Sequence, residues 1–158
     1  MMLFFLAALL FVLILFFGYR AITSLSEKQN TIALADFKVG FAGAVDAIKG
    51  NHGNVAFFTA RPPATKLCII DPEMSASQLS GYAQLIPIFR AKTGNIILLR
   101  DSAIVDTVYR DDIIVGSAGN PNYCCYDTHQ SVKLRLEGIA GKALVGAANA
   151  ELNRCLQA

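Results

Sequence analysis

The sequence opens with MMLFFLAALLFVLILFFGYR (Met1–Arg20), in which the first seventeen residues are all apolar and the first charged side chain is Arg20. A helix that is apolar on every side is buried on every side, in lipid or in protein. At 1.5 Å per residue, Met1–Phe17 spans about 26 Å as a helix, close to the roughly 30 Å hydrocarbon core of a bilayer. The stretch therefore predicts a helix that inserts into a membrane.

An amphipathic pattern follows the apolar segment, and no proline interrupts the chain up to Ala60. Apolar residues recur at steps of three and four, the period of a helix with one buried face. The stretch KGNHGN (Lys49–Asn54) ends the pattern with a basic last turn and glycines. A continuous helix from Met1 to Lys49 would be about 73 Å long. We expect its second half to pack on the protein's own domain through Leu34, Phe37, Phe41, Val45 and Ile48.

After Gly53 the sequence changes to short β-prone runs. Val132, Leu134 and Leu136 alternate with charged residues, the pattern of a half-buried antiparallel strand. The other expected strands lie at 55–58, 66–70, 95–99, 103–109, 112–115 and 142–147. Short helical structure is expected between residues 75 and 93, with Pro87 at a first helical position and Gly94 as the C-terminal cap.

These patterns predict an α+β fold, in which a long N-terminal α-helix, apolar and then amphipathic, carries a C-terminal antiparallel β-rich globular domain. The boundaries that we expect are 1–49 for the helix and 50–158 for the domain. A chain of 158 residues has room for one such domain and an appendage.

The charge of the chain argues against one class of partner. The formal net charge is +2, and the 14 basic residues form no block. Because nucleic-acid affinity depends on several lysine or arginine contacts to phosphates, we expect no nucleic-acid partner.

Four cysteines follow the apolar segment, at Cys68, Cys124, Cys125 and Cys155. An even number behind a membrane-directed segment favours an oxidising compartment and up to two disulfides. A bridge between the adjacent Cys124 and Cys125 would close an unusual eight-membered ring, so we expect Cys68 to pair with one of these two. The alternative is a reducing compartment with four free, buried thiols.

Residues that carry catalysis or bind metals are sparse. A zinc site of Cys68, Cys124, Cys125 and His129 is disfavoured, because adjacent cysteines chelate one tetrahedral ion poorly and a C-x₂₋₄-C hook is missing. The sequence holds no C-x-x-C pair, G-x-S-x-G elbow, phosphate-binding glycine loop or H-E-x-x-H motif. We expect no catalytic residue, no cofactor and no metal, and we rank an enzyme third among the function classes.

The acidic residues outside the helix are expected on the surface. Asp71, Glu73, Asp111 and Asp112 lack the spacing of a calcium-binding loop. Asp71 precedes a proline and should start a turn, and Asp101 is expected in a hairpin turn.

The apolar start has three interpretations. A cleavable secretory signal is disfavoured, because the segment lacks a basic region ahead of it, exceeds the usual apolar length and has no small-x-small site after it. A plain membrane anchor fits by length. However, Arg20 and Lys28 after the span would then place the domain in the cytoplasm, which conflicts with the cysteines. In the third interpretation a short basic leader has been removed and the sequence is a mature form.

In this third interpretation the sequence resembles a type IV pilin-like subunit, of the archaeal kind. The resemblance rests on the apolar start, on the unbroken amphipathic continuation to Gly50, and on the β-rich domain after it. It covers about the first fifty residues in pattern. Bacterial pilins carry a glutamate at the fifth mature position, where this sequence has Phe5, and archaeal pilins often lack that glutamate.

The resemblance implies a structural protein that polymerises with copies of itself into an extracellular filament at the cell surface. The subunit would sit in the membrane before assembly, and the pilus assembly machinery would be a further partner. The leading alternative is a single-pass membrane-tethered domain that binds a partner or assists secretion. The residues expected in the assembly helix are Met1, Leu3, Phe4, Phe5, Leu6, Leu9, Leu10, Phe11, Leu13, Ile14, Phe16 and Phe17.

Overall fold

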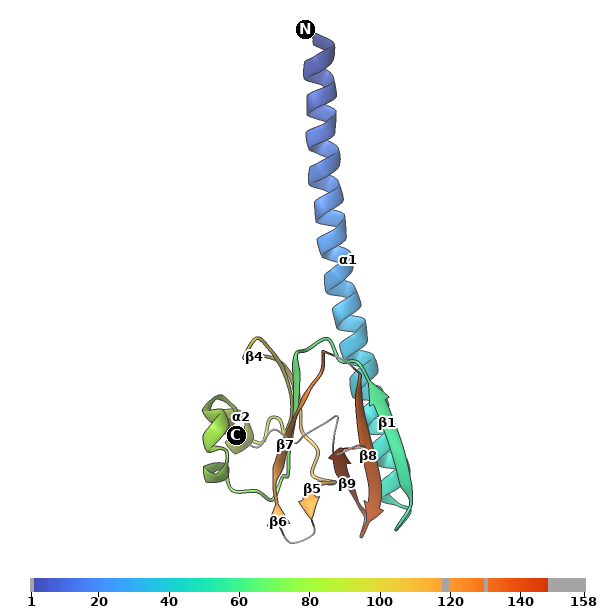
Figure 1. The fold of residues 1–158 in the computed structure, drawn as a ribbon, viewed down its shortest axis with the longest axis vertical. Helices are drawn as coiled ribbons and strands as arrows, with labels where there is room; N and C mark the ends of the chain where they lie inside the picture. The colour runs from blue at the N-terminus through green and yellow to red at the C-terminus, as the bar shows by residue number, and fades with distance from the viewer. Residues whose placement is uncertain (1, 118–119, 130, 148–158) are drawn as a thin grey trace.

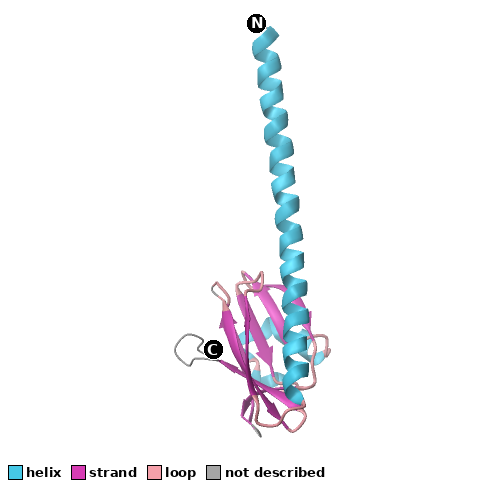
Figure 2. Ribbon diagram, turned by 90° about the vertical axis from the view of Figure 1, so that its right-hand side faces the viewer, coloured by secondary structure: helices cyan, strands magenta, loops and turns pink. Residues whose placement is uncertain are grey.

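A helix of 48 residues, α1 (Met2–Lys49), leads directly into a domain of β-strands (Figures 1 and 2). The computed structural model describes residues 2–117, 120–129 and 131–147. The N-terminal part of α1 projects away from the domain as a bare rod, and its C-terminal part, from Leu34 onward, lies along the strands. The α+β fold expected from the sequence is confirmed.

One sheet has five strands in the order β1-β8-β9-β5-β6. Its strands are β1 (Val55–Ala60), β5 (Ile113–Ser117), β6 (Asn120–Pro121), β8 (Val132–Ile139) and β9 (Lys142–Ala147). Strand β8 pairs antiparallel with β1 and β9, and its residues alternate between buried and more exposed as expected. The expectation of antiparallel pairing is wrong at one place, because β5 pairs parallel with β9.

The other sheet has four antiparallel strands in the order β4-β3-β2-β7. Its strands are β2 (Lys66–Ile70), β3 (Ile96–Arg100), β4 (Ala103–Val108) and β7 (Tyr123–Asp127). The β3–β4 hairpin turns at Asp101 and Ser102, whose φ angles are 50° and 69°. The hairpin turn expected at Asp101 is thereby confirmed, since aspartate tolerates this left-handed region better than most residues.

Three short helical segments cover the outer face of the four-stranded sheet: η1 (Ala76–Gln78), η2 (Ser80–Leu85) and α2 (Ile86–Arg90). Pro87 lies in the first turn of α2, as expected. The prediction that Gly94 forms the C-terminal cap of this helix is wrong. The left-handed residue after α2 is Lys92, at φ 51°, whereas a Cβ on Gly94 would lie 2.5 Å from the Cβ of Thr107. Gly94 thus permits a close approach to β4.

The described residues of the domain form two apolar cores, one on each face of the four-stranded sheet. The first core lies between α1 and the two sheets and includes Phe41, Leu67, Val115 and Leu134. The second core lies between the four-stranded sheet and the short helical segments, and it includes Cys68, Leu85 and Cys125. The four-stranded sheet is therefore buried on both faces, which explains the continuous apolar runs of β2 and β3.

Two carboxylates expected on the surface are instead largely shielded from water. Asp71 is buried, and its Oδ2 accepts a hydrogen bond of 2.9 Å from the backbone N–H of Val115. Its Oδ1 accepts one of 2.9 Å from the N–H of Glu73, which makes the turn expected next to the proline. Asp112 is only partly exposed, because it is bonded to Arg110 and Lys49. Buried carboxylates persist where donors surround them, and the sequence does not reveal these donors.

Candidate assembly helix and its junction with the domain

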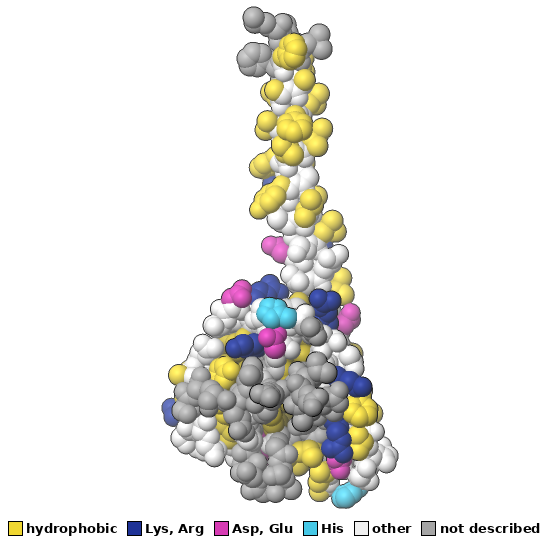
Figure 3. All heavy atoms as spheres, viewed as in Figure 1, with side chains coloured by type: hydrophobic (Ala, Val, Ile, Leu, Met, Phe, Trp, Pro, Cys, Tyr) yellow, Lys and Arg dark blue, Asp and Glu magenta, His cyan; other side chains and the backbone are white. Residues whose placement is uncertain are grey.

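The first half of α1 exposes its apolar side chains on all sides. The described large side chains from Phe4 to Phe17 are 42 to 83% exposed. Figure 3 shows them along the bare rod, far from the domain. Among the described residues, α1 is the one helix that is long and apolar enough to cross a membrane, judged by length and composition. Met1 lies outside the described residues, as do the side chains of Leu3 and Phe5.

So many exposed apolar side chains are unfavourable in water, so they must be buried against lipid or protein. Burying one leucine, isoleucine or phenylalanine is worth about 1.5–3 kcal/mol. The domain leaves eleven large apolar side chains between Phe4 and Phe17 exposed. The surface is thus suited to a bilayer interior or to packing against other protein chains.

The second half of α1 is fixed to the domain by an aromatic cluster. Phe37 and Phe41 are buried, with ring centroids 6.0 Å apart, and Phe58 of β1 packs on both at 6.0 and 5.6 Å. Val45 and Ile48 are buried one and two turns further along. Leu34 is partly buried at the edge of the same core. These five α1 residues are the set named above for packing on the domain.

Ion pairs fix the end of α1 to the loop before β5. The guanidinium of Arg110 donates to Asp112 from Nε at 2.8 Å and to Asp46 of α1 from Nη2 at 2.6 Å. Lys49 Nζ lies 2.9 Å from Asp112 and 2.7 Å from Asp46. About three turns earlier on α1, Lys38 pairs with Asp106 of β4. Together these contacts hold α1 against both sheets.

The ion pairs shift the ionisation of their members. The Arg110 guanidinium, followed by Lys49, holds the pKa of Asp112 well below its usual range, against the opposing effect of burial. The same two cations lower the pKa of Asp46. The carboxylates in turn raise the pKa of Lys49. All four groups are therefore charged across the physiological range.

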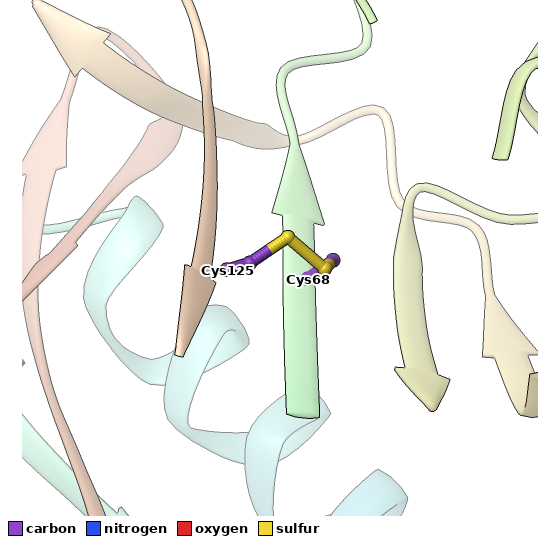
Figure 4. Close-up of a disulfide and its surroundings, with 2 residues drawn as sticks. All are labelled: Cys68 and Cys125. Carbon is purple, nitrogen blue, oxygen red and sulfur yellow. A yellow bond between two sulfur atoms is a disulfide. The ribbon is translucent and has the colours of Figure 1, made fainter. Parts of the chain in front are cut away.

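A buried disulfide joins Cys68 of β2 to Cys125 of β7 (Figure 4). The two cysteines are direct partners in the register of the strands, and their Cα atoms are 4.0 Å apart. The expected disulfide is thus present, and the partner of Cys68 is Cys125. Cys124 is disulfide-bonded as well, and Cys155 lies outside the described residues.

The residues considered for a zinc site make other bonds and contacts. Cys68 and Cys125 are bonded to each other, and His129 is exposed beside Asp127. Within residues 2–117, 120–129 and 131–147, no group of three or more histidine, cysteine or acidic side chains could hold a metal ion. One cleft of about 240 Å³ is lined by residues that include Lys66, Tyr82 and Asp101.

Sequence reasoning did not identify Arg110 and Gly138 as parts of the junction. Gly138 of β8 lies under the turn after α1, where an added Cβ would be 2.2 Å from the carbonyl oxygen of Asn51 and 2.4 Å from that of Ile48. The only signal in the sequence was a glycine inside an otherwise alternating strand, which often marks a close backbone approach.

No known protein family, curated protein or solved structure matches the chain.

Proposed function

We propose that this protein is a structural subunit that polymerises into an extracellular, type IV pilus-like filament through the apolar half of α1. The observation that supports this best is a single continuous helix with two different halves. One half is apolar and exposed on every side, and the other is fixed to the domain by a buried aromatic cluster and ion pairs.

The two halves give the proposal a physical mechanism. Before assembly, the segment around Phe4–Phe17 lies in the bilayer. On leaving the lipid, the same surfaces are covered by copies from neighbouring subunits, at about 25 cal/mol per Å² of apolar area. Because α1 continues into the domain without a flexible linker, the packing of the helices also sets the positions of the domains.

The disulfide supports an extracytoplasmic location. Disulfides such as Cys68–Cys125 form and persist in oxidising compartments and are rare in the cytoplasm. We therefore propose that the domain faces the outside of the cell, that the pilus assembly machinery extracts the subunit from the membrane, and that other copies of the chain are its main partners.

Electron microscopy of the native protein tests the proposal. Material sheared from the cell surface should contain the protein in thin fibres, which negative staining shows directly. Mass spectrometry of the purified fibres should find this chain as the main component. Protein that stays monodisperse in the membrane fraction, with no fibres in the sheared fraction, would contradict the proposal.

The second candidate is a single-pass membrane-tethered domain that binds a partner or assists secretion. The observation in its favour is that the apolar half of α1 approaches the thickness of a bilayer. The two candidates differ for a chain without Met1–Arg20. A tethered domain should then be released as a folded, soluble protein that still binds its partner. A filament subunit should also be soluble and folded, but it should be missing from fibres.

A further inference from the structure

The second half of α1 carries a second apolar stripe that the domain leaves uncovered. Leu25, Ile32 and Val39 are 59, 60 and 74% exposed and are spaced seven residues apart. The complementary positions of the heptad, four residues before or three residues after, are occupied by Ala21, Lys28, Ala35 and Ala42. We call the stripe the outer seam, and it consists of Ala21, Leu25, Lys28, Ile32, Ala35, Val39 and Ala42.

The outer seam lies on the side of α1 opposite the domain. At 3.6 residues per turn, Leu25, Ile32 and Val39 lie within about 25° of the direction opposite to the mean of the packed residues. Those packed residues are Phe37, Phe41, Val45 and Ile48. The domain therefore cannot fold back onto the seam, and a second body can approach it without meeting the domain.

A membrane does not cover the outer seam either. Arg20, Glu27 and Lys28 lie on the helix between the apolar segment and Ile32. With Phe4–Phe17 in the hydrocarbon, Ile32 is about 22 Å beyond Phe17 along the helix axis. Three large aliphatic side chains would thus remain in water on a tethered monomer, which is unfavourable for each.

We propose that the outer seam binds a second copy of this chain, helix to helix and parallel. The inference rests on the self-association proposed above and names the surface that performs it. Copies inserted into one membrane by the same segment are already parallel. Because three of the four complementary positions are alanines, two helices can approach closely, with large seam residues packing over small ones.

The same heptad continues into the apolar half of α1. Phe4, Phe11 and Gly18 extend the positions of Leu25, and Ala7 and Ile14 extend those of Ala21. A seven-residue repeat over this length favours a left-handed supercoil of the paired helices. The same face of α1 would thus bind a neighbouring helix both inside the membrane and outside it.

Lys28 is the charged residue at a seam position, and it restricts the alignment of the two copies. In exact register, two Lys28 ammonium groups would face each other. A shift of one heptad separates them and still places seam residues against seam residues. The shifted contact joins two different parts of the helix, so it repeats from copy to copy along an open assembly.

Adjacent charge substitutions test the seam. Leu25→Glu places a carboxylate on the seam, and Ser24→Glu places the same charge about 100° round the helix, on an exposed position one residue away. Ile32→Glu and Thr31→Glu form a second matched pair. All four sites lie outside the domain cores, so formation of the Cys68–Cys125 disulfide should be unchanged and serves as the folding control.

If the wild-type chain forms fibres, the seam variants should lower the fibre yield at least about tenfold, whereas the Ser24 and Thr31 variants should keep it. Equal effects within a matched pair, or no effect of either seam variant, would overturn the seam and leave the filament proposal standing.

If the wild-type chain forms no fibres, the filament proposal fails, and cross-linking in native membranes decides the seam separately. A photoreactive amino acid in place of Ile32 should then give covalent dimers of the full chain, several-fold more than one in place of Thr31. Equal yields at the two positions, or no dimers at all, would overturn the seam.

Discussion

Gly138 shows how closely the backbone of α1 approaches the five-stranded sheet. Its N–H donates to Asn54 and its carbonyl accepts from Gly53, so neither strand nor turn is free to move away. The Cβ of an alanine would overlap the carbonyl oxygens of Asn51 and Ile48. Backbone atoms cannot rotate out of the way as side chains can, so the contact is selective for glycine.

We predict that Gly138→Ala destabilises the protein by about 2–4 kcal/mol, because it overpacks the junction and displaces the end of α1. Thermal or urea unfolding of the full chain in detergent measures the change. Gly146→Ala on the neighbouring strand is the control, since an added Cβ there meets no atom within 4 Å. A Gly138→Ala protein as stable as the Gly146→Ala protein would contradict the prediction.

Tyr126 is a second residue whose properties are set by its surroundings. Its side chain is buried in the first core, and its hydroxyl has no hydrogen-bond partner among the described residues. Burial raises the pKa of Tyr126 to about 12, because it disfavours the phenolate. An unpaired buried hydroxyl costs about 1–3 kcal/mol.

We therefore expect Tyr126→Phe to be neutral or stabilising near pH 7. In the wild-type protein, Tyr126 loses its phenolic proton near pH 10 when the chain is unfolded, but only near pH 12 when it is folded. Stability should thus fall between these values, by up to about 3 kcal/mol. Urea unfolding at several pH values between 9 and 12 should show a shallower fall for the phenylalanine variant. Equal slopes would contradict this account.

At the scale of elements, the end of α1 is held to the loop before β5 by Arg110 and two carboxylates. Exposed ion pairs contribute little to stability, but Arg110 and Asp112 are mostly shielded from water and share several hydrogen bonds. The ionised form of Asp112 stabilises the folded protein, because Arg110 lowers the pKa of Asp112 in the folded state.

This linkage predicts an acid dependence. A carboxyl group with a lowered folded pKa stabilises the protein above its unfolded pKa, near 3.8, and this contribution is lost as the pH falls further. We expect Asp112→Asn to lower the melting temperature by a few degrees at pH 7 and to have a smaller effect at pH 2–3. Asp111→Asn, at an exposed neighbour, is the control. An effect of Asp112→Asn that is the same at both pH values would contradict the linkage.

At the scale of the whole molecule, the Cys68–Cys125 disulfide closes a loop with a sequence separation of 57 residues, which includes β3, β4 and β5. A cross-link of this length lowers the entropy of the unfolded chain by an amount worth about 4 kcal/mol. The two cysteines are also fully buried in the second core. The disulfide should therefore matter more for the stability of the domain than for the shape of α1.

We predict that the double variant Cys68→Ala, Cys125→Ala loses about 2–5 kcal/mol of stability and keeps the helical content of α1. Circular dichroism and urea unfolding measure the two quantities. The alanine variant of His129, an exposed residue near the end of β7, is the control. A double variant as stable as the wild-type chain would show that the disulfide contributes nothing to folding.

Patterns that depend on near neighbours in the sequence were predictable. The helix, the alternation in β8 and the turn at Asp101 follow from local periodicity and turn chemistry. The sequence also predicted that Phe37 and Phe41 share a face of α1, because four residues make about one turn. It did not reveal what covers that face, since Phe58 is brought there only by the sheet.

The sequence by itself determined the two-part helix, the β-rich domain and the presence of apolar surface in excess of what the domain can bury, because these depend on composition and period. Only the tertiary structure decided that β5 runs parallel to β9, that Asp71 is buried, and that Cys125 and not Cys124 meets Cys68. Adjacent residues on a strand point to opposite faces, so the choice between two neighbouring cysteines depends on register. Register and long-range pairing depend on segments far apart in the chain, and local patterns do not specify them.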